Sequence, residues 1–467
     1  KNGFKLSLRG YDPQGDFLAL TRQARGRRVV PSDPGRSLML LKPTGAVPHK
    51  GGVRFTPESL EYRVLAGWIA GGTPPPRPDD PRVESIEALP ARAVLRPGMG
   101  QDLIVRARYG DGRVEEVTRW AKYTATEGSV AQVDEGGRVQ VMGHGEGAVT
   151  VWYQSRIFVA TISVPYENQA PDEVFARAPR RNFIDELALK KLRSLRLPPS
   201  PPASDAEFLR RAFIDTLGVL PTAAEARAFL ADGGADKRDR LIEGLLARSE
   251  FVDYWAYKWS DLLLVNSESL APDALWTYYR WIKDRVAAGT PWDRLVRELV
   301  TAKGSTLENG AASFYVLHQD PRVMAETVSV AFLGMSIGCA RCHNHPMEKW
   351  TNDQYYGMAS LFARVRAKEA PGSGNRVVFC ATEGELVQPL TGKPQLPRPL
   401  EGSSIPFEAG EDRRTHLAAW LTSPENPYFA RAVANRVWKN FLGVGLVEAA
   451  DDLRMTNPAS NEELLSA

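Results

Sequence analysis

Apolar residues recur at helical spacing near the start of the chain. Two glycines end the stretch SLEYRVLAGWIAGG, whose apolar positions are Leu60, Val64, Leu65 and Trp68. This spacing predicts an amphipathic helix that stops at the glycine pair. The proline-rich run TPPPRPDDP, residues 73–81, follows and predicts a semi-rigid linker. We therefore expect a separate helical domain over residues 1–77.

The pattern changes to short alternating runs over residues 82–166. The runs are VESIEAL, DLIVRARY, RVQVMG and GAVTVWY, and turn dipeptides such as PG, DG and GG separate them. Alternation of apolar and polar residues places one face of a strand in a core and the other in water. Strands at such short intervals are typical of a β-sandwich. We expect an all-β domain inserted here.

Helical periodicity returns over residues 167–368. Ser204 is followed by Glu207 and Thr222 by Glu225, and each pair is a capping box that predicts a helix start. A further amphipathic stripe is aromatic and consists of Trp255, Trp259 and Leu262. The simplest interpretation of these tryptophans is the core of a helical domain, and the sharper one is the wall of a flat cofactor.

The rest of the chain divides into two segments. Residues 369–405 contain VVFCA and ELVQPL, which predict a short hairpin before a proline-rich linker. Residues 406–467 return to helical spacing and predict the start of another helical domain. The chain begins at Lys1 without a methionine and ends in NEELLSA, so we expect it to be a piece of a longer protein.

Composition narrows the possible functions. The chain has 467 residues, a net charge of +3 and interspersed charges of both signs, which argues against a basic nucleic-acid-binding face. The longest apolar stretches, such as VSVAFLGMSIG, are too short to cross a bilayer, so no transmembrane segment is expected in this fragment. Neither a P-loop nor H-E-x-x-H occurs, so neither of these motifs indicates hydrolase chemistry.

The densest chemistry is in the stretch CARCHNHPMEKW, which contains two of the three cysteines. Its first five residues have the C-x-x-C-H pattern of covalent haem attachment. Two thiols at this spacing can add to the two vinyl groups of one porphyrin edge, and the following imidazole binds the iron. Cys339 and Cys342 would then carry thioethers to haem c, and His343 would be the iron ligand.

Two alternatives fit the same residues. Zinc also binds C-x-x-C with histidines, and the ligands would be Cys339, Cys342, His343 and His345, although zinc ligand pairs usually lie further apart in sequence. A thiol–disulfide redox pair is the other alternative, but the βαβ pattern that accompanies such pairs is absent. The third cysteine, Cys380 in VVFCA, is expected to be a buried and inert strand residue.

The second axial position of the haem iron has several candidates. We place Met358 and His318 first, and the others are Met335, Met347 and His416. His345 is too close in sequence to His343 to reach the opposite face of the haem, so we expect it near the haem rim, holding a propionate or capping a turn. An open position would instead allow small ligands or peroxide to bind.

Several segments resemble a known family. FLGMSIGCARCHNHPMEKWTNDQYYGMASLFARV and YWAYKWSDLLL resemble the planctomycete cytochrome-c-associated domain family, and NPYFARAVANRVWKNFLGVGLVEAADDLRMTNPASN resembles the start of its C-terminal companion domain, whose function is unknown. The first 75 residues resemble the back half of the family's N-terminal cytochrome c domain. Residues 82–166 resemble a bacterial immunoglobulin-like domain of group 2, a module that usually spaces or binds.

This resemblance has consequences for fold, location and ligands. It implies a multidomain protein that is mainly α-helical with an inserted all-β immunoglobulin-like sandwich. Haem c is attached outside the cytoplasm, which implies a periplasmic, cell-envelope or extracellular protein. The N-terminal domain of the family carries its own haem, so His49 in VPHKGG is a possible distal ligand of a haem that is attached upstream; a surface histidine beside a glycine turn is the simpler alternative.

Together these observations favour an exported haem c protein that passes electrons or anchors an electron-passing assembly. Its partner would be a redox protein or another envelope component. One alternative is a zinc-stabilised scaffold that binds surface polysaccharide or protein, and the other is a haem enzyme with an open coordination site.

Overall fold

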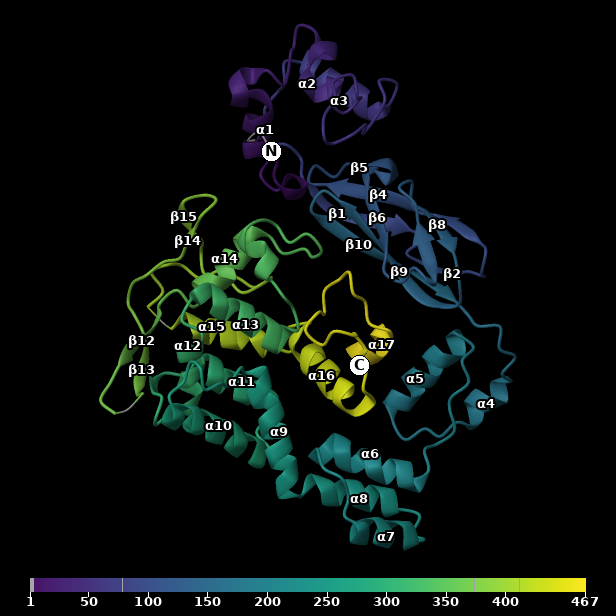
Figure 1. The fold of residues 1–467 in the computed structure, drawn as a ribbon, viewed down its shortest axis with the longest axis vertical. Coiled ribbons are helices and arrows are strands. Elements are labelled where there is room, and N and C mark those ends of the chain that lie inside the picture. Colours follow the sequence, from purple (N-terminus) through teal and green to yellow (C-terminus); the bar gives the residue numbers. More distant parts are fainter. Residues whose placement is uncertain (1–3, 78, 373, 411) are drawn as a thin grey trace.

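The fold was analysed in a computed structural model that describes residues 4–77, 79–372, 374–410 and 412–467. Small N-terminal helices lie at one end of the molecule, a strand-rich region lies beside them, and helices fill the rest (Figure 1). The C-terminal segment turns back into the middle of the molecule (Figure 1). There α16 (Phe429–Leu442) contacts α6 (Asp205–Leu217) and α13 (Pro321–Leu333), and α17 (Glu462–Ser466) contacts α5 (Phe183–Ser194). Parts that are distant in sequence therefore meet near the centre.

The N-terminal region has three α-helices among its described residues: α1 (Pro13–Thr21), α2 (Leu38–Leu41) and α3 (Leu60–Ala70). The predicted helix is confirmed as α3, which Ser59 caps by accepting a hydrogen bond from the Tyr62 N–H. The predicted apolar stripe is only partly buried, because Val64 is 51% exposed and the fully buried residue of α3 is Ile69. The region is too small to enclose the whole stripe.

The strand-rich region contains the alternating runs. Its strands are β1 (Val83–Leu89), β2 (Arg92–Val94), β3 (Gly100–Asp102), β4 (Ile104–Tyr109), β5 (Val114–Glu116), β6 (Lys122–Ala125), β7 (Ala131–Val133), β8 (Arg138–Val141), β9 (Gly145–Tyr153) and β10 (Arg156–Val164). They form three small sheets in the orders β1-β4-β5, β2-β10-β9-β6 and β3-β8-β7, around one apolar core. Strand β4 alternates strictly between exposed and buried residues, as the sequence pattern predicts.

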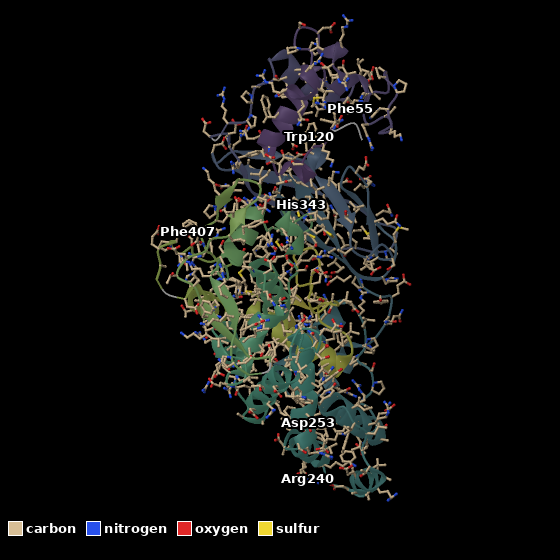
Figure 2. All side chains as sticks on the ribbon, turned by 60° about the vertical axis from the view of Figure 1, so that its left-hand side comes forward. Phe55, Trp120, Arg240, Asp253, His343 and Phe407 are labelled. Carbon is tan, nitrogen blue, oxygen red and sulfur yellow. The ribbon has the colours of Figure 1, made fainter. Side chains whose placement is uncertain are left out.

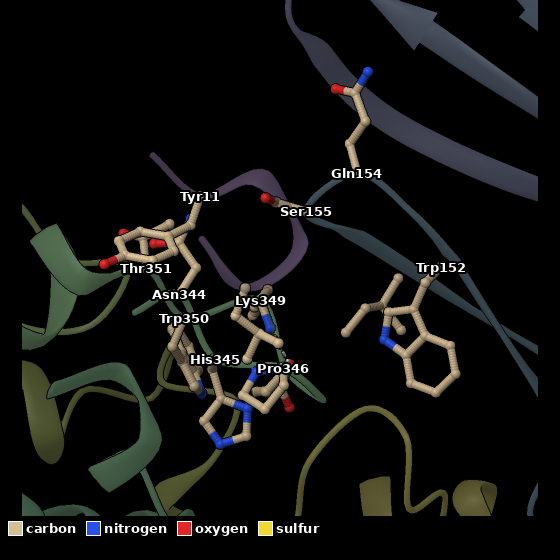
Figure 3. A pocket seen from close by; sticks show the side chains of 13 residues that line it. Tyr11, Trp152, Gln154, Ser155, Asn344, His345, Pro346, Lys349, Trp350 and Thr351 are labelled. Atoms are coloured by element: carbon tan, nitrogen blue, oxygen red, sulfur yellow. Dashed lines mark hydrogen bonds between the residues drawn. The ribbon is translucent and has the colours of Figure 1, made fainter. Parts of the chain in front are cut away.

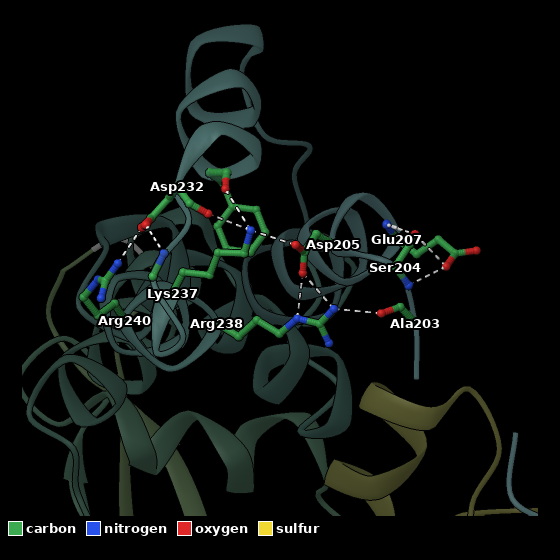
Figure 4. Close-up of polar contacts among 10 residues, drawn as sticks. Ala203, Ser204, Asp205, Glu207, Asp232, Lys237, Arg238 and Arg240 are labelled. Atoms are coloured by element: carbon green, nitrogen blue, oxygen red, sulfur yellow. Dashed lines mark hydrogen bonds and ion pairs between the residues drawn. The ribbon is translucent and has the colours of Figure 1, made fainter. Parts of the chain in front are cut away.

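Five helices follow the strands, and the last three of them share a small apolar core. The helices are α4 (Asp172–Arg177), α5 (Phe183–Ser194), α6 (Asp205–Leu217), α7 (Ala223–Ala231) and α8 (Lys237–Leu246). Both predicted capping boxes are confirmed, at the starts of α6 and α7. Asp205 at the start of α6 pairs with Lys237 at 2.7 Å and with Arg238 at 2.8 Å, which joins α6 to the start of α8 (Figure 4).

The main apolar core lies among the following helices. These are α9 (Ser249–Leu262), α10 (Pro272–Ala287), α11 (Trp292–Val300), α12 (Ser313–Leu317), α13 (Pro321–Leu333), α14 (Asn352–Ser360), α15 (Arg413–Leu421) and α16 (Phe429–Leu442). The last helix, α17 (Glu462–Ser466), belongs to a smaller core with Leu446 and Val447. The aromatic stripe of α9 lies against this core, with the rings of Trp255 and Trp259 5.5 Å apart. No helix in the described part of the chain is both long and apolar enough to cross a membrane.

The predicted hairpin forms with a different partner. VVFCA lies in β13 (Arg376–Cys380), but β13 pairs with β12 (Val365–Glu369) and β11 (Gly304–Ser305) instead of with ELVQPL. ELVQPL contributes β14 (Val387–Gln388), which pairs with β15 (Lys393–Pro394). The prediction placed no strand between residues 167 and 368, because alternation marks a strand but does not identify its partner. The fold is therefore more mixed than helices plus one inserted β-domain.

Candidate functional site

The C-x-x-C-H motif lies on a tight turn between two helices. Helix α13 ends at Gly334, whose φ of 64° is the left-handed conformation that favours glycine. A 3-10 turn spans Gly338–Arg341, and Cys342 directly follows it. Cys339 and Cys342 are both free and exposed. The turn therefore presents both thiols to the outside.

His343 is half-buried and has a fixed ring orientation. Its Nδ1 lies 2.7 Å from the backbone oxygen of Asn344. A carbonyl oxygen can only accept, so Nδ1 carries a proton, and in the neutral form of the ring the lone pair is then at Nε2. This arrangement is the one that metal-binding histidines use, in which the second ring nitrogen donates to a carbonyl.

His345 stabilises the loop that follows the motif. Its Nδ1 accepts a hydrogen bond from the Met347 N–H at 3.2 Å, and its own backbone N–H donates to the Trp350 oxygen at 2.8 Å. Burial, together with the positive charge of Arg454, lowers the pKa of His345 to about 4. Its ring is thus a neutral turn cap, which is one of the two roles expected for it.

The turn rests on the N-terminus of α14. The side-chain amide of Asn352 donates to the backbone oxygens of Ala340 at 2.7 Å and Arg341 at 3.0 Å. Its backbone N–H donates to Asn344 Oδ1 at 3.0 Å. Asn352 is buried and therefore fixes the residues between the two cysteines and the residue after His343 at the same time.

The C-terminal segment holds the loop from the other side. The buried carboxylate of Glu348 accepts a hydrogen bond from the Met455 N–H at 2.7 Å, and Thr456 Oγ1 donates to the Met347 oxygen at 3.1 Å. The Leu453 N–H donates to the Gly334 oxygen at 2.8 Å, before the motif. Residues 453–456 therefore contact the chain on both sides of the two cysteines.

Three regions of the molecule meet at this loop. Figure 2 shows His343 near the level at which the N-terminal helices give way to the helical body. A small cavity of about 20 Å³, enough for one water molecule, is lined by residues from all three regions (Figure 3). The N-terminal region contributes Leu8 and Tyr11, and the β9–β10 turn contributes Gln154 and Ser155. Residues of the loop 344–351 also line the cavity. The motif is thus at a junction between domains.

Two segments of the chain, one of which contains the motif, match known family models. Residues 183–367 match the family model PSCyt2, a protein of unknown function (DUF1549). Residues 413–467 match the model PSD1, a protein of unknown function (DUF1553). These matches support the resemblance to the planctomycete cytochrome-associated family over the two segments and extend neither to the N-terminal region nor to the strands. No curated protein matches the chain.

The PSCyt2 segment contains the haem-site residues predicted from the motif. The structure brings only some of them together. Cys339, Cys342 and His343 are together on the turn, with His345 close by. Met358 is on α14, which contacts the turn, but its side chain is completely buried in the main core. His318 is buried at the end of α12, edge-on to Phe314. Its ring contact is with Phe314 and not with a residue of the motif.

The other candidate ligands are engaged elsewhere. Met335 is buried in the core, and the Met347 sulfur accepts a hydrogen bond from Arg454 at 3.3 Å. His416 Nε2 donates to the Ser403 oxygen at 3.0 Å. His49 is exposed on a turn of the N-terminal region and lies over Gly51, where an added Cβ would come within 2.4 Å of its ring.

The geometry bears both on the zinc alternative and on the third cysteine. Within the described ranges, no three or more His, Cys, Asp or Glu side chains converge as a metal-binding group. Cys339, Cys342, His343 and His345 therefore lie near one another without forming a tetrahedral set. Cys380 ends β13 and is half-buried; burial raises the pKa of its thiol, in agreement with the inert role expected for it.

Sequence reasoning missed four residues of the site. Asn344 and Glu348 lie inside the quoted stretch, where their polarity between a motif and a tryptophan was a signal that could have been used. Asn352 follows Thr351, which forms a capping box with Gln354, so its position at a helix start was predictable. Tyr11 gave no signal, because only the folded chain brings it to His343.

Proposed function

We propose that this chain is part of an exported multidomain c-type haem protein that transfers electrons. The haem would be attached through Cys339 and Cys342 and bound by His343. The observation that carries the proposal is the orientation of His343, whose Nδ1 donates to Asn344 and leaves Nε2 available, next to two free and exposed thiols. The match to PSCyt2, a cytochrome-related family name, supports the same cofactor.

The residues of the motif fit the chemistry of haem c. When bound, haem c supplies reversible one-electron transfer at its iron. Asn352 and the 3-10 turn hold the two sulfurs in place, so little conformational entropy is lost when they are attached. Asn344 orients the imidazole, and such a partner of a metal ligand increases the basicity of the ligand.

The other regions have supporting roles in the proposal. The ten strands over residues 83–164 would be the immunoglobulin-like spacer, which sets the distance between the N-terminal region and the PSCyt2 segment. His49 would bind a haem that belongs to a cytochrome domain upstream. The protein would work in the periplasm or elsewhere in the cell envelope, where a redox protein or another envelope component would be its partner.

The decisive experiment is expression with haem-maturation machinery in an exporting host. The wild-type chain should show a Soret band that survives acid–acetone extraction, because thioether bonds are covalent. The double variant Cys339→Ala/Cys342→Ala should lose it. Cys380→Ala is the matched control, because it removes the remaining cysteine and should keep the band.

The outcomes also separate the alternatives. A chain that holds zinc by elemental analysis and shows no visible absorbance would replace the proposal with the interaction scaffold. A haem enzyme is the second candidate for the motif, and the complete burial of Met358 favours it, since that methionine is enclosed by the core rather than presented to the turn. Carbon monoxide or cyanide would shift the spectrum of a haem with an open position and leave a six-coordinate carrier unchanged.

A further inference from the structure

We propose that Tyr11, from the N-terminal region, is a haem-contacting residue that positions His343 and shields the attachment edge from water. The inference rests on the proposed haem function of the motif. It assigns part of the cofactor site to a region outside the PSCyt2 segment.

Tyr11 lies against the iron-binding histidine. The centres of the Tyr11 and His343 rings are 6.2 Å apart and their planes are tilted by 54°. Aromatic pairs at this separation attract one another beyond the area they bury. Tyr11 also lines the junction cavity together with Asn344, the residue that fixes the His343 ring. The His343 imidazole is therefore oriented by the hydrogen bond that it donates to the Asn344 backbone oxygen and by the ring of Tyr11.

Tyr11 is also close to one of the two thiols. Its ring partner His343 directly follows Cys342 in the chain, so the ring contact places Tyr11 beside the residue next to that sulfur. A macrocycle attached to Cys342 and bound by His343 occupies the space next to both residues. The Tyr11 ring is near the His343 anchor point and would therefore lie on that side of the macrocycle.

The backbone around Tyr11 is well ordered by polar contacts. The Ser7 N–H donates to Asp16 at 2.6 Å, and the Asp12 N–H donates to Ser7 Oγ at 3.1 Å. Asp12 caps α1 by accepting from the Gly15 N–H at 2.9 Å. These three bonds close a compact loop around Tyr11 and restrain the backbone that carries its ring.

The local structure suggests what this ring does. Cys339 and Cys342 are exposed, so an attached haem would have one edge in water unless another region covered it. Solvent exposure stabilises the oxidised, more highly charged form of a haem and lowers its reduction potential. Tyr11 covers the side of Cys342 and His343, and it would therefore hold the potential higher than the isolated PSCyt2 segment could.

The first test uses the haem-loaded full chain and spectroelectrochemical titration. Tyr11→Ala should shift the midpoint potential to a more negative value, and Tyr11→Phe, which keeps the ring, should stay at the wild-type potential. Tyr257→Ala is the matched control, because Tyr257 lies on α9 and is 65% exposed. A Tyr11→Ala potential equal to that of wild type would overturn the inference, as would an equal shift in Tyr257→Ala.

The second test uses the haem-free chain and the rate of thiol alkylation, followed by mass spectrometry of each cysteine. Tyr11→Ala should speed the alkylation of Cys342 by about threefold to tenfold, the loss expected for one aromatic contact, and leave Cys339 nearly unchanged. Equal acceleration of both thiols, or of neither, would contradict the placement of Tyr11. If the wild-type chain attaches no haem, the proposed function fails, while this second test still decides whether Tyr11 covers Cys342.

Discussion

Helix α14 and the 3-10 turn of the motif are neighbours, but they are stabilised in different ways. Almost every side chain of α14 is buried, and the helix is enclosed by the main core on all sides. The turn buries only Ala340, exposes both thiols, and is held by hydrogen bonds from Asn352. Apolar packing thus fixes the base, and a few polar contacts fix the part that would carry the cofactor.

The difference shows how an exposed site can be rigid. Hydrophobic burial is strong but does not specify direction, whereas a buried amide that donates twice fixes a backbone in one orientation. A turn anchored to such a helix needs no core of its own. We therefore expect mutations in the base to affect folding and mutations in the turn to affect chemistry.

The largest effect is expected in the base. Phe362 is the second residue after α14 and is completely buried in the main core. Phe362→Ala should lower the free energy of unfolding by about 3–5 kcal/mol, because it leaves a cavity in a close-packed core. Denaturant titration of the haem-free chain measures the loss. Phe183→Ala, at a phenylalanine that is 53% exposed, is the control and should change it by less than about 0.5 kcal/mol.

The pH dependence of stability tests the burial of His318. Burial lowers the pKa of His318 from 6.5 to about 4, and the side chain is only 6% exposed. The unfolded chain binds the proton first as the pH falls, so stability present above pH 6.5 is lost toward pH 4, by about 2–3 kcal/mol.

The His318 contribution is isolated by comparison with His318→Asn, which cannot titrate in this range. The difference in unfolding free energy between wild type and variant should shrink as the pH falls from 6.5 to 4. Parallel pH profiles would mean that His318 is accessible to water in solution, contrary to its position in the core.

An intermediate effect is expected where the PSD1 segment contacts the loop. The two carboxylate oxygens of Glu348 accept from the Met455 N–H and the Lys349 N–H. Glu348→Gln replaces one of these oxygens by an amide NH2 group, which cannot accept a hydrogen bond from either N–H. The unfolding free energy should fall by about 1–3 kcal/mol, and the Met455 amide should exchange faster with deuterium. Glu383→Gln, at an exposed glutamate, should change neither quantity. Unchanged exchange at Met455 would show that Glu348 does not hold the PSD1 segment.

The smallest effect is expected at the thiols themselves. Cys339→Ala and Cys342→Ala should each change the unfolding free energy of the haem-free chain by less than about 0.5 kcal/mol, because both side chains are exposed. Thermal unfolding at one protein concentration is sufficient to measure this. A loss comparable to that of Phe362→Ala would mean that the turn is part of the core, and the contrast between base and turn would not hold.

Much of the local structure could be predicted from the sequence. Ser204 with Glu207 and Thr222 with Glu225 marked two helix starts, because capping depends on residues that are close in the chain. The alternation in DLIVRARY predicted a strand for a similar local reason. Strand partners were not predictable: VVFCA pairs with Val365–Glu369, and nothing local distinguishes that partner from ELVQPL.

By itself, the sequence determined the candidate chemistry of the protein, because C-x-x-C-H brings two thiols and an imidazole together through the chain alone. Only the tertiary structure decided the surroundings of that motif: the Asn352 anchor, the PSD1 contacts at Glu348, the burial of Met358 and the ring of Tyr11. The physical reason is range. Spacing within one turn is fixed by covalent geometry, whereas contacts between distant segments depend on how whole apolar faces pack against each other.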